Sequence, residues 1–241
     1  MIIQACLNGA RPTGFHPRLP LSPSQLAAEG VEAVAAGAAE IHLHVRDRAG
    51  IESLAPEAVD PTVAALRARL PGTLIGVSTG AWIEKDDDRR LASIAGWREL
   101  PDYASVNLSE AGAPAVIELL HRRGIGIEAG LASAADAERL LRLGLARLAL
   151  RMLVEIDRQD LAEAMSIADA VLALLQKGGV RKPVLLHGFD ATVWPFVERT
   201  ARGGLSTRVG LEDGAMLPDG TPASSNAALV AAAARIRAGQ A

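Results

Sequence analysis

The chain has very little cysteine, few aromatic residues and no long uninterrupted apolar run. Only one of its 241 residues is a cysteine, Cys6, and 3% are aromatic. A single cysteine cannot form an internal disulfide, and Cys6 lies in an apolar run, so we expect a reduced, buried thiol. No stretch reaches the roughly 18 apolar residues of a membrane span, and the first residues lack the basic start of a signal peptide. We therefore expect a soluble, cytoplasmic protein with no membrane contact.

An excess of basic residues and the motifs of nucleotide chemistry are also missing. There are 25 Lys and Arg residues against 28 Asp and Glu residues, a formal net charge of −3, which gives no electrostatic reason to expect a nucleic-acid partner. The glycine pairs at 178–179 and 203–204 form neither a Walker loop nor a dinucleotide fingerprint. No Gly-x-Ser-x-Gly nucleophile elbow occurs. With 49% hydrophobic residues, the sequence is that of an ordinary folded protein.

Short strand-like runs alternate with alanine- and leucine-rich stretches of helical spacing from one end of the chain to the other. This alternation predicts parallel strands joined by helices. The first helix is marked by Ser22 and Pro23 at its start and by Gly37 at its end. The predicted strands cover residues 2–7, 40–45, 73–78, 103–107, 126–128, 147–150, 183–187 and 207–209.

Eight consecutive strand–helix units in this length predict an α/β fold, a (β/α)8 TIM barrel that forms one domain over residues 1–241. A doubly wound open sheet is the main alternative. Polar residues at the carboxyl ends of the strands favour the barrel, because a barrel gathers those ends around one mouth and an open sheet spreads them along its edge. These residues are His42, His44, Ser78, Thr79, Asn107, Ser109, Glu128, His187, Arg208, Glu212 and Asp213.

The segment 41–46 carries the strongest chemical signal in the sequence. Its period-two alternation places His42, His44 and Arg46 on one face of a strand. A lone histidine is usually an interior residue satisfied by hydrogen bonds, but two on one face of a covered parallel strand have only the barrel mouth to occupy. Such a pair needs one carboxylate to complete the three-ligand, open-position site typical of catalytic zinc.

The segment 207–213 offers that carboxylate. Taken alone, Glu212 and Asp213 could be a solvated surface turn. However, Arg208, Gly210 and Glu212 share a parity, and the last strand of a closed barrel lies beside the first. Glu212 is therefore the predicted third ligand. Asp213, held ionised by Arg208 and the metal, is the predicted general base, and its opposite parity requires the chain to bend there.

Other polar residues at strand ends are candidates for substrate binding. Ser78 and Thr79 precede a glycine, a pattern also common in plain turns, but hydroxyl groups at this end of a barrel strand can hold a carboxylate. Asn107 is a similar, weaker candidate. Glu128 and Glu155 are further candidates, either as mouth residues or as partners of Arg151, and His187 is a candidate for contact with the substrate or with a residue that supports the site. None of the three has a specific signal.

The sequence resembles the β-keto acid cleavage enzyme family, whose founding activity is 3-keto-5-aminohexanoate cleavage. The likeness covers nearly the whole chain, and the combination of its His-x-His and Arg-Val-Gly-Leu-Glu-Asp blocks is specific. The matching segments are 8–11, 19–23, 39–47, 78–80, 207–213 and 225–227. The resemblance implies a zinc-dependent barrel, commonly a homo-oligomer, that reacts a β-keto acid with acetyl-CoA to give acetoacetate and a new acyl-CoA.

The resemblance also implies roles for single residues. His42, His44 and Glu212 match the zinc ligands, Arg208 and Asp213 match the activating dyad, Ser78 matches a substrate-binding serine, and Asn107 falls near a threonine. Arg11 stands where the founding activity has a glutamate that recognises the amino group of its substrate. We therefore expect Arg11 to favour a neutral or anionic keto acid.

Other functions fit the same residues. Two histidines and a carboxylate also form the facial triad of non-haem Fe(II) oxygenases. A CoA-independent metal-dependent lyase or hydrolase on the same barrel is a further alternative. A barrel that binds a small acid without turning it over is the non-catalytic one, and the complete ligand and dyad set argues against it.

Overall fold

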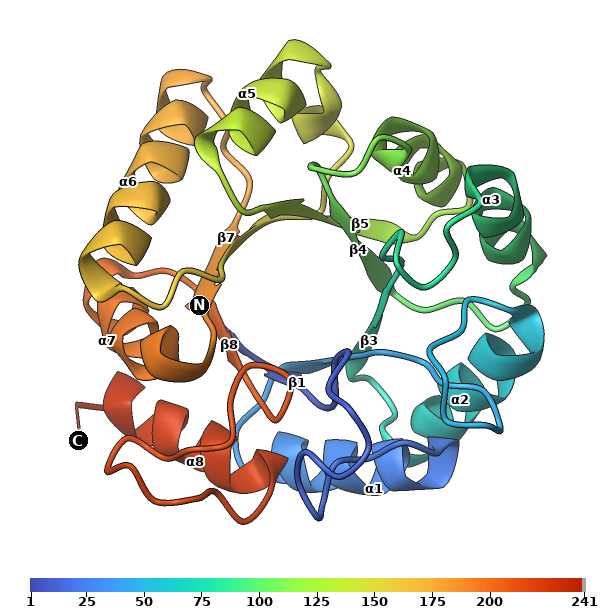
Figure 1. Ribbon diagram of the computed structural model, residues 1–241, viewed down its shortest axis with the longest axis horizontal. Helices are drawn as coiled ribbons and strands as arrows, with labels where there is room; N and C mark the ends of the chain where they lie inside the picture. The colour runs from blue at the N-terminus through green and yellow to red at the C-terminus, as the bar shows by residue number, and fades with distance from the viewer. Residues whose placement is uncertain (240–241) are drawn as a thin grey trace.

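The computed structural model describes residues 1–239, which form a ring of parallel strands surrounded by helices (Figure 1). The eight strands follow the order β7-β6-β5-β4-β3-β2-β1-β8. Strands β2 to β6 therefore each lie between the strands before and after them in sequence, and β1 lies between β2 and β8. The strands are β1 (Ile3–Cys6), β2 (Glu40–Leu43), β3 (Leu74–Ser78), β4 (Tyr103–Asn107), β5 (Gly126–Leu131), β6 (Arg151–Ile156), β7 (Val184–Gly188) and β8 (Thr207–Val209).

The two edges of the sheet meet between β7 and β8. Ser206, just before β8, forms a parallel bridge with Leu185 of β7. The Leu186 amide donates a hydrogen bond to the Ser206 carbonyl over 3.0 Å, and the Thr207 hydroxyl donates to the Leu186 carbonyl over 3.0 Å. The sheet is therefore a nearly closed barrel, and the predicted (β/α)8 TIM barrel is confirmed.

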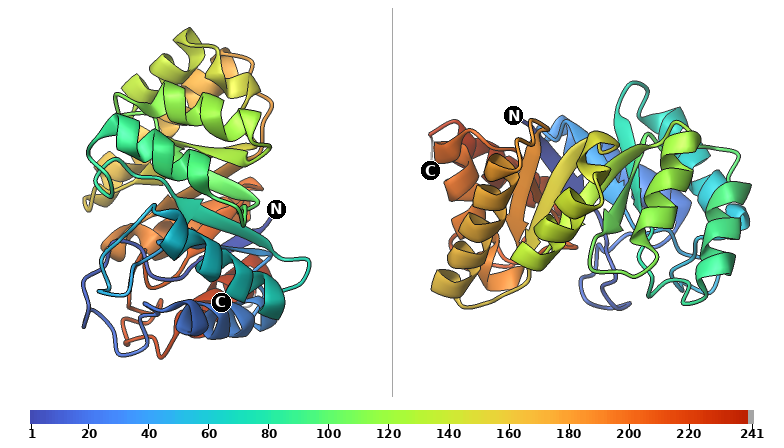
Figure 2. Two further views of the ribbon diagram at one scale, coloured as in Figure 1. Left: turned by 90° about the vertical axis from the view of Figure 1, so that its right-hand side faces the viewer. Right: turned by 90° about the horizontal axis from the view of Figure 1, so that it is seen from above.

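The helices cover the outer face of the barrel, as the side views show (Figure 2). Helix α1 begins where the sequence predicts, because Ser22 and Gln25 form a reciprocal capping box and Pro23 is the first helical residue. It ends at Ala35, and Gly37 then has a φ of 115°. The helices are α1 (Pro23–Ala35), α2 (Pro56–Arg69), α3 (Asp87–Gly96), α4 (Ala113–Arg122), α5 (Ala134–Arg142), α6 (Leu161–Lys177), α7 (Val193–Gly203) and α8 (Asn226–Arg237).

The predicted strand at residues 147–150 is wrong. Residues 145–147 form a short 3-10 helix, η1 (Leu145–Arg147), and the strand runs instead from Arg151 to Ile156. Leu150 is 43% exposed, so the apolar residues in 147–150 do not have the two covered faces of a barrel strand. β5 also extends three residues beyond the predicted 126–128.

The misplacement of β6 has an electrostatic reason. From the local sequence we expect Arg151 to follow the end of a strand. In the structure its side chain points into a polar layer inside the barrel. Its guanidinium lies 2.5 Å from Glu40 and 2.8 Å from Glu128. The Gln4 amide also donates hydrogen bonds to both carboxylates. A buried arginine is tolerated within a strand when carboxylates meet it there.

All eight strands run in one direction, so their carboxyl ends form a single rim. The loops that follow the eight strands therefore converge at the same mouth. Within residues 1–239, no helix has both the length and the apolar character required to cross a bilayer.

Candidate active site and metal centre

His42 and His44 lie at the carboxyl end of β2 and are both buried, with 1% and 5% exposure. Their rings stand edge to face with centroids 5.6 Å apart. Asn8, beyond the end of β1, continues the pairing of the two strands through its side chain. Its amide donates to the His44 carbonyl over 2.8 Å, and its oxygen accepts from the His44 amide over 2.9 Å. The backbone that carries His44 is thereby fixed beyond the last regular residue of β2.

Glu212 reaches the same point from the loop after β8. Gly210 allows the close approach, because a Cβ there would overlap the carbonyl oxygen of Cys6 in β1. The Glu212 amide then donates to that same carbonyl over 3.2 Å. One ligand atom from each of His42, His44 and Glu212 lies within 4.8 Å of the others. The structure therefore brings together the three residues that the sequence predicts as metal ligands.

The donor atoms of this cluster fit a metal ion. His42 Nδ1 and Glu212 Oε2 are buried and have no hydrogen-bond partner among the described residues. His44 Nε2 points toward Glu212 Oε1 at 3.5 Å. Buried polar atoms without partners are costly, and a cation among them removes that cost. Two imidazoles and a carboxylate are the donor set of many catalytic zinc sites. The residues present thus form a possible three-ligand metal site.

A second carboxylate orients His44 from behind. Glu52 Oε1 lies 2.6 Å from His44 Nδ1, and the Trp82 indole donates to Glu52 Oε2 over 3.1 Å. Trp82 also stacks on the His44 ring with centroids 6.0 Å apart. Carboxylates behind a ligating histidine fix its tautomer and raise its basicity. Glu52 is not among the residues predicted from the sequence, because nothing in its local pattern shows that the β2–α2 loop folds back toward His44.

The pKa values of the two histidines differ in direction. Burial lowers the pKa of His42 to about 3, so its imidazole is neutral. Burial also lowers the pKa of His44, but the charges and hydrogen bonds of Glu212 and Glu52 outweigh it and raise the value to about 9. Without a metal, His44 therefore carries a proton between two carboxylates. A metal ion would take the place of that positive charge.

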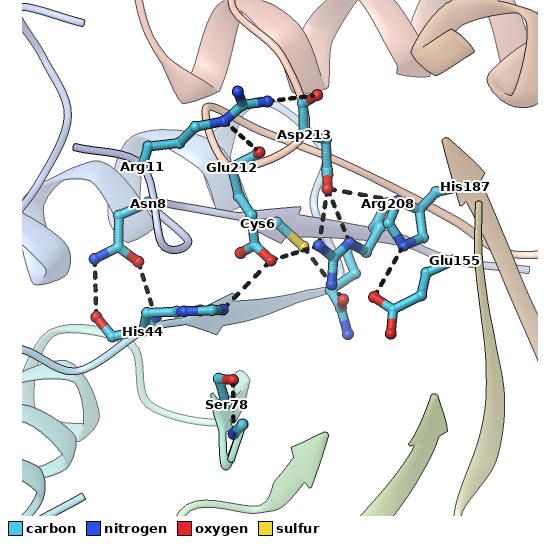
Figure 3. Close-up of polar contacts among 12 residues, drawn as sticks. Cys6, Asn8, Arg11, His44, Ser78, Glu155, His187, Arg208, Glu212 and Asp213 are labelled. Carbon is cyan, nitrogen blue, oxygen red and sulfur yellow. Dashed lines mark hydrogen bonds and ion pairs between the residues drawn. The ribbon is translucent and has the colours of Figure 1, made fainter. Parts of the chain in front are cut away.

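Arg208 in β8 holds both acids of the following loop (Figure 3). Its Nε and Nη2 donate to Asp213 Oδ1 over 3.1 and 2.8 Å, and Nη2 lies 2.5 Å from Glu212 Oε1. The predicted bend is present, because the amides of Asp213 and Gly214 both donate to the Gly210 carbonyl. That turn allows two consecutive side chains to reach the same guanidinium.

Asp213 is fully buried, and its Oδ2 has no partner among the described residues. Burial raises the pKa of Asp213 to about 7, since Arg208 lowers it less and the Glu212 charge raises it further. The sequence predicts that Arg208 and the metal together keep this carboxylate ionised. With Arg208 alone the pKa is about 7 and the carboxyl is only partly ionised at neutral pH, because the cost of burying the charge exceeds the stabilisation from Arg208.

A cavity of about 530 Å³ opens above the cluster. Ser78 at the end of β3, Asn107 at the end of β4 and Arg11 in the β1–α1 loop line it together with His42, His44, Arg208 and Glu212. Thr79 is placed differently from the prediction. It is buried, and its hydroxyl donates to the Ser105 carbonyl over 2.7 Å. Thr79 therefore ties β3 to β4, while Ser105 lines the cavity.

Glu155 also lines the cavity, and burial raises its pKa to about 7. Its Oε2 lies 3.9 Å from Nε2 of His187, whose Nδ1 lies 3.5 Å from Asp213 Oδ1. The sequence analysis assigned neither residue a specific role. The predicted strand at 147–150 leaves Glu155 outside β6. In the structure β6 spans 151–156, so Glu155 lies on the same face as Arg151 and is paired with His187 of β7.

Two curated proteins are similar to part of this chain. The chain is 34% identical over 95 residues to the 3-keto-5-aminohexanoate cleavage enzyme of Acetoanaerobium sticklandii, a match that covers 39% of this chain and 35% of that protein. It is 36% identical over 92 residues to the enzyme of the same name from Fusobacterium nucleatum, which covers 38% of this chain and 34% of that protein. These alignments span only about a third of the curated relatives.

A solved structure described as the ternary complex of ObcA with C4-CoA adduct and oxalate shares the fold. Its TM-score is 0.74 at 17% identity, and the match covers 93% of this chain and 64% of that chain. A family model described as beta-keto acid cleavage enzyme matches residues 1–239. The chain belongs to the β-keto acid cleavage enzyme family.

Proposed function

We propose that this protein is a zinc-dependent enzyme that reacts a β-keto acid with acetyl-CoA to give acetoacetate and a new acyl-CoA. In this exchange the bond between C2 and C3 of the keto acid breaks, and so does the bond between the acetyl carbon and the CoA sulfur. C2 bonds to the acetyl carbon, and the acyl group released from the keto acid bonds to the CoA sulfur. The observation that carries the proposal is the His42–His44–Glu212 cluster at the floor of one cavity. Arg208 also lines this cavity and pairs with Asp213, which is buried beside the cluster.

His42, His44 and Glu212 are the residues that would hold the zinc ion. Bound there, zinc would polarise the keto carbonyl and stabilise the oxyanion charge that develops as the carbon–carbon bond changes. The alternative metal, iron, has the same preferred donor set, so metal identity is part of the test.

Asp213 is the proposed general base. Its Oδ1 is held by Arg208, which leaves the buried Oδ2 to accept a proton from the carbon between the carboxylate and the keto group. A carboxylate with a pKa of about 7 is well matched to that step near neutral pH. The role of Arg208 is to fix the carboxylate and to limit the charge that is buried with it.

Ser78 in β3 and Asn107 in β4 line the cavity and are the proposed substrate-binding residues. The structure adds Ser105, which also lines the cavity and is paired with Ser78 in the register of the two strands. Arg11 also lines the cavity and is proposed to favour a neutral or anionic keto acid. The Thr79 hydroxyl donates to the Ser105 carbonyl, so Thr79 is not part of the proposed site.

A CoA thioester as the second substrate is supported by the family and by the CoA adduct named in the ObcA complex. The family resemblance also favours a homo-oligomer, which light scattering on the purified protein would test. A cytoplasmic location stays a proposal.

Mass spectrometry of CoA products tests the reaction. Zinc-loaded protein is incubated with a panel of β-keto acids and acetyl-CoA labelled with carbon-13 in the acetyl group. We expect the label in the methyl and keto carbons of acetoacetate and an unlabelled acyl-CoA that matches each accepted keto acid. The chelator-treated protein is the control.

Two results would overturn the proposal. Loss of keto acid without any acyl-CoA would assign the site to a CoA-independent lyase or hydrolase. Oxygen uptake after iron loading, with none of the acyl exchange, would assign it to the Fe(II) oxygenases.

A further inference from the structure

Arg11 contacts the backbone of the two residues that the proposed chemistry needs most. Its Nε donates to the Glu212 carbonyl over 3.0 Å, and its Nη2 donates to the Asp213 carbonyl over 3.2 Å. The same Nη2 lies 2.7 Å from Asp190 Oδ1. The guanidinium thus spans two consecutive peptide groups and one carboxylate, and Figure 3 shows it lying over the segment that carries Glu212 and Asp213.

Asp190 holds that segment from the other side. Its amide donates to the Asp213 carbonyl over 2.7 Å. Among residues 1–239, Asp190 is the one non-glycine residue with a positive φ, 44°. A left-handed backbone is strained for a residue with a side chain and persists only where surrounding contacts enforce it. The β7–α7 loop therefore adopts an unfavourable conformation that places one N–H against the Asp213 carbonyl.

The β1–α1 loop, which carries Arg11, is also held in place by hydrogen bonds. Arg46 Nη2 donates to the carbonyls of Gly9 and Arg11 over 3.0 and 2.7 Å, which ties the β1–α1 loop to the chain just beyond His44. A Cβ at Gly9 would overlap the Glu212 side chain, so this loop packs directly on the predicted ligand. Arg11 is thus connected to both segments that carry predicted ligands. Its side chain contacts the Glu212 carbonyl, and its own carbonyl accepts from Arg46, two residues beyond His44.

We propose that Arg11 and Asp190 are positioning residues that fix the Glu212–Asp213 peptide segment, so that Glu212 meets the metal and Asp213 meets the substrate at the same time. The proposal rests on the proposed function for its kinetic part only. Consecutive residues of a strand point to opposite faces, so a bent segment must be held by external hydrogen bonds if both side chains are to reach one mouth. Arg11 and Asp190 supply three such bonds to two carbonyls.

A positioning role for Arg11 has different consequences from a simple substrate-binding role. Half of the Asp190 side chain is exposed, at 52%, and an ion pair so open to solvent contributes little to global stability. Loss of the pair should therefore leave the folded protein intact and alter the geometry of the site. Displacements of about 1 Å at supporting residues are enough to reduce turnover 10²-fold.

The test uses Arg11→Gln, Arg11→Lys, Asp190→Ala and Asp190→Asn in the full chain. The matched control is Arg199→Gln, because Arg199 and Asp169 form an Arg–Asp pair of similar exposure, 23% and 69%, between the outer helices α7 and α6. Zinc affinity is measured by competition with a chromophoric chelator, and kcat and KM are measured separately. Thermal unfolding checks that each variant is folded.

We expect Arg11→Gln and Asp190→Ala to weaken zinc binding about 10-fold to 100-fold, as the loss of residues that support metal ligands does. Both should lower kcat more than they raise KM. Both variants at position 190 keep the backbone N–H, but only Asp190→Asn keeps a side-chain oxygen acceptor for Arg11 and the tolerance of a positive φ, so it should restore most of the loss. Arg11→Lys should fall between, because one ammonium cannot reach both carbonyls and the carboxylate together. Arg199→Gln should match the unsubstituted protein.

Two outcomes would overturn the proposal. If Arg11→Gln raises KM alone and leaves zinc affinity unchanged, Arg11 is a substrate contact. If Asp190→Ala lowers KM for anionic keto acids, Asp190 restrains a guanidinium whose partner is the substrate. The zinc measurement does not depend on the reaction. Weakened zinc binding in a protein without β-keto acid cleavage would therefore support the positioning role and reject the proposed function.

Discussion

Glu52 Oε1 lies 2.6 Å from Nδ1 of His44, on the side of the imidazole opposite Glu212. The Nδ1 proton is therefore held by a carboxylate, and Nε2 is directed at the metal cluster. Sequence spacing places the two residues eight positions apart, but their contact depends on the antiparallel bridge between Arg46 and Glu52 that folds the β2–α2 loop back. The relationship makes Glu52 part of the proposed zinc site.

Replacing Glu52 with Gln should weaken zinc binding about 10-fold to 100-fold, because a neutral amide raises the basicity of His44 less than a carboxylate does. Chelator competition at constant pH measures the change. Trp82→Phe is the control, since it removes the indole donor to Glu52 and keeps an aromatic ring over His44. Equal zinc affinity in Glu52→Gln and the unsubstituted protein would show that Glu52 does not support the ligand.

His44→Ala should abolish zinc binding and turnover together, because two ligands do not complete a catalytic zinc site. Metal analysis after dialysis and the acyl-CoA assay on the same sample provide the two readings. A metal-free His44→Ala protein with full activity would contradict the metal assignment.

Asp213→Asn should retain zinc and reduce turnover by roughly 10²-fold or more, as expected for loss of a general base. The amide has nearly the same shape and still accepts from Arg208, so the fold should be preserved. Measuring zinc content beside kcat separates the base from the ligands. Near-normal turnover with zinc bound would transfer the proton step to another group.

The pH dependence of stability should reveal the buried carboxyl of Glu128. Burial raises its pKa from the usual 4.5 to about 7; the charge of Arg151 lowers the pKa by less, and the charge of Glu40 raises it further. The folded protein binds this proton more tightly than the unfolded chain does, so the contribution to stability is present below pH 4.5 and is lost as pH rises toward 7. Each unit of such a shift corresponds to about 1.4 kcal/mol.

Urea unfolding at pH 5 and pH 8 measures this effect. The unsubstituted protein should lose more free energy of unfolding between the two values than Glu128→Gln does. Glu138→Gln, at an exposed position on α5, should follow the unsubstituted protein. Parallel pH profiles for Glu128→Gln and the unsubstituted protein would place the titration elsewhere.

Gly210→Ala should destabilise the protein and displace Glu212, since the new methyl group would overlap the backbone of Cys6. Overpacking of this kind costs about 1–3 kcal/mol, and more where backbone must move. Gly203→Ala is the matched control, because nothing lies within 4 Å of its Cβ and it is the last residue of α7. We expect that control to be neutral or slightly stabilising, with both variants compared by thermal unfolding.

Much of the fold follows from local pattern. Seven of the eight predicted strand positions overlap an observed strand, because period-two runs and capped helices are properties of short segments. The exception is β6, where the decisive interaction is the ion pairing of Arg151 with Glu40 and Glu128. Those partners are distant in sequence, and no local periodicity reports them.

In the candidate site, too, some features follow from the local sequence and others depend on tertiary contacts. The sequence by itself determined that His42, His44, Arg208, Glu212 and Asp213 are the residues to examine, because each combines a reactive side chain with a strand-end position. Only the tertiary structure decided that Glu52 orients His44, that Thr79 faces a backbone carbonyl, and that Arg11 holds the Glu212 carbonyl across 201 residues of sequence. The physical reason is that periodicity fixes which face a side chain occupies, whereas the identity of its partner depends on how the closed barrel brings its loops together.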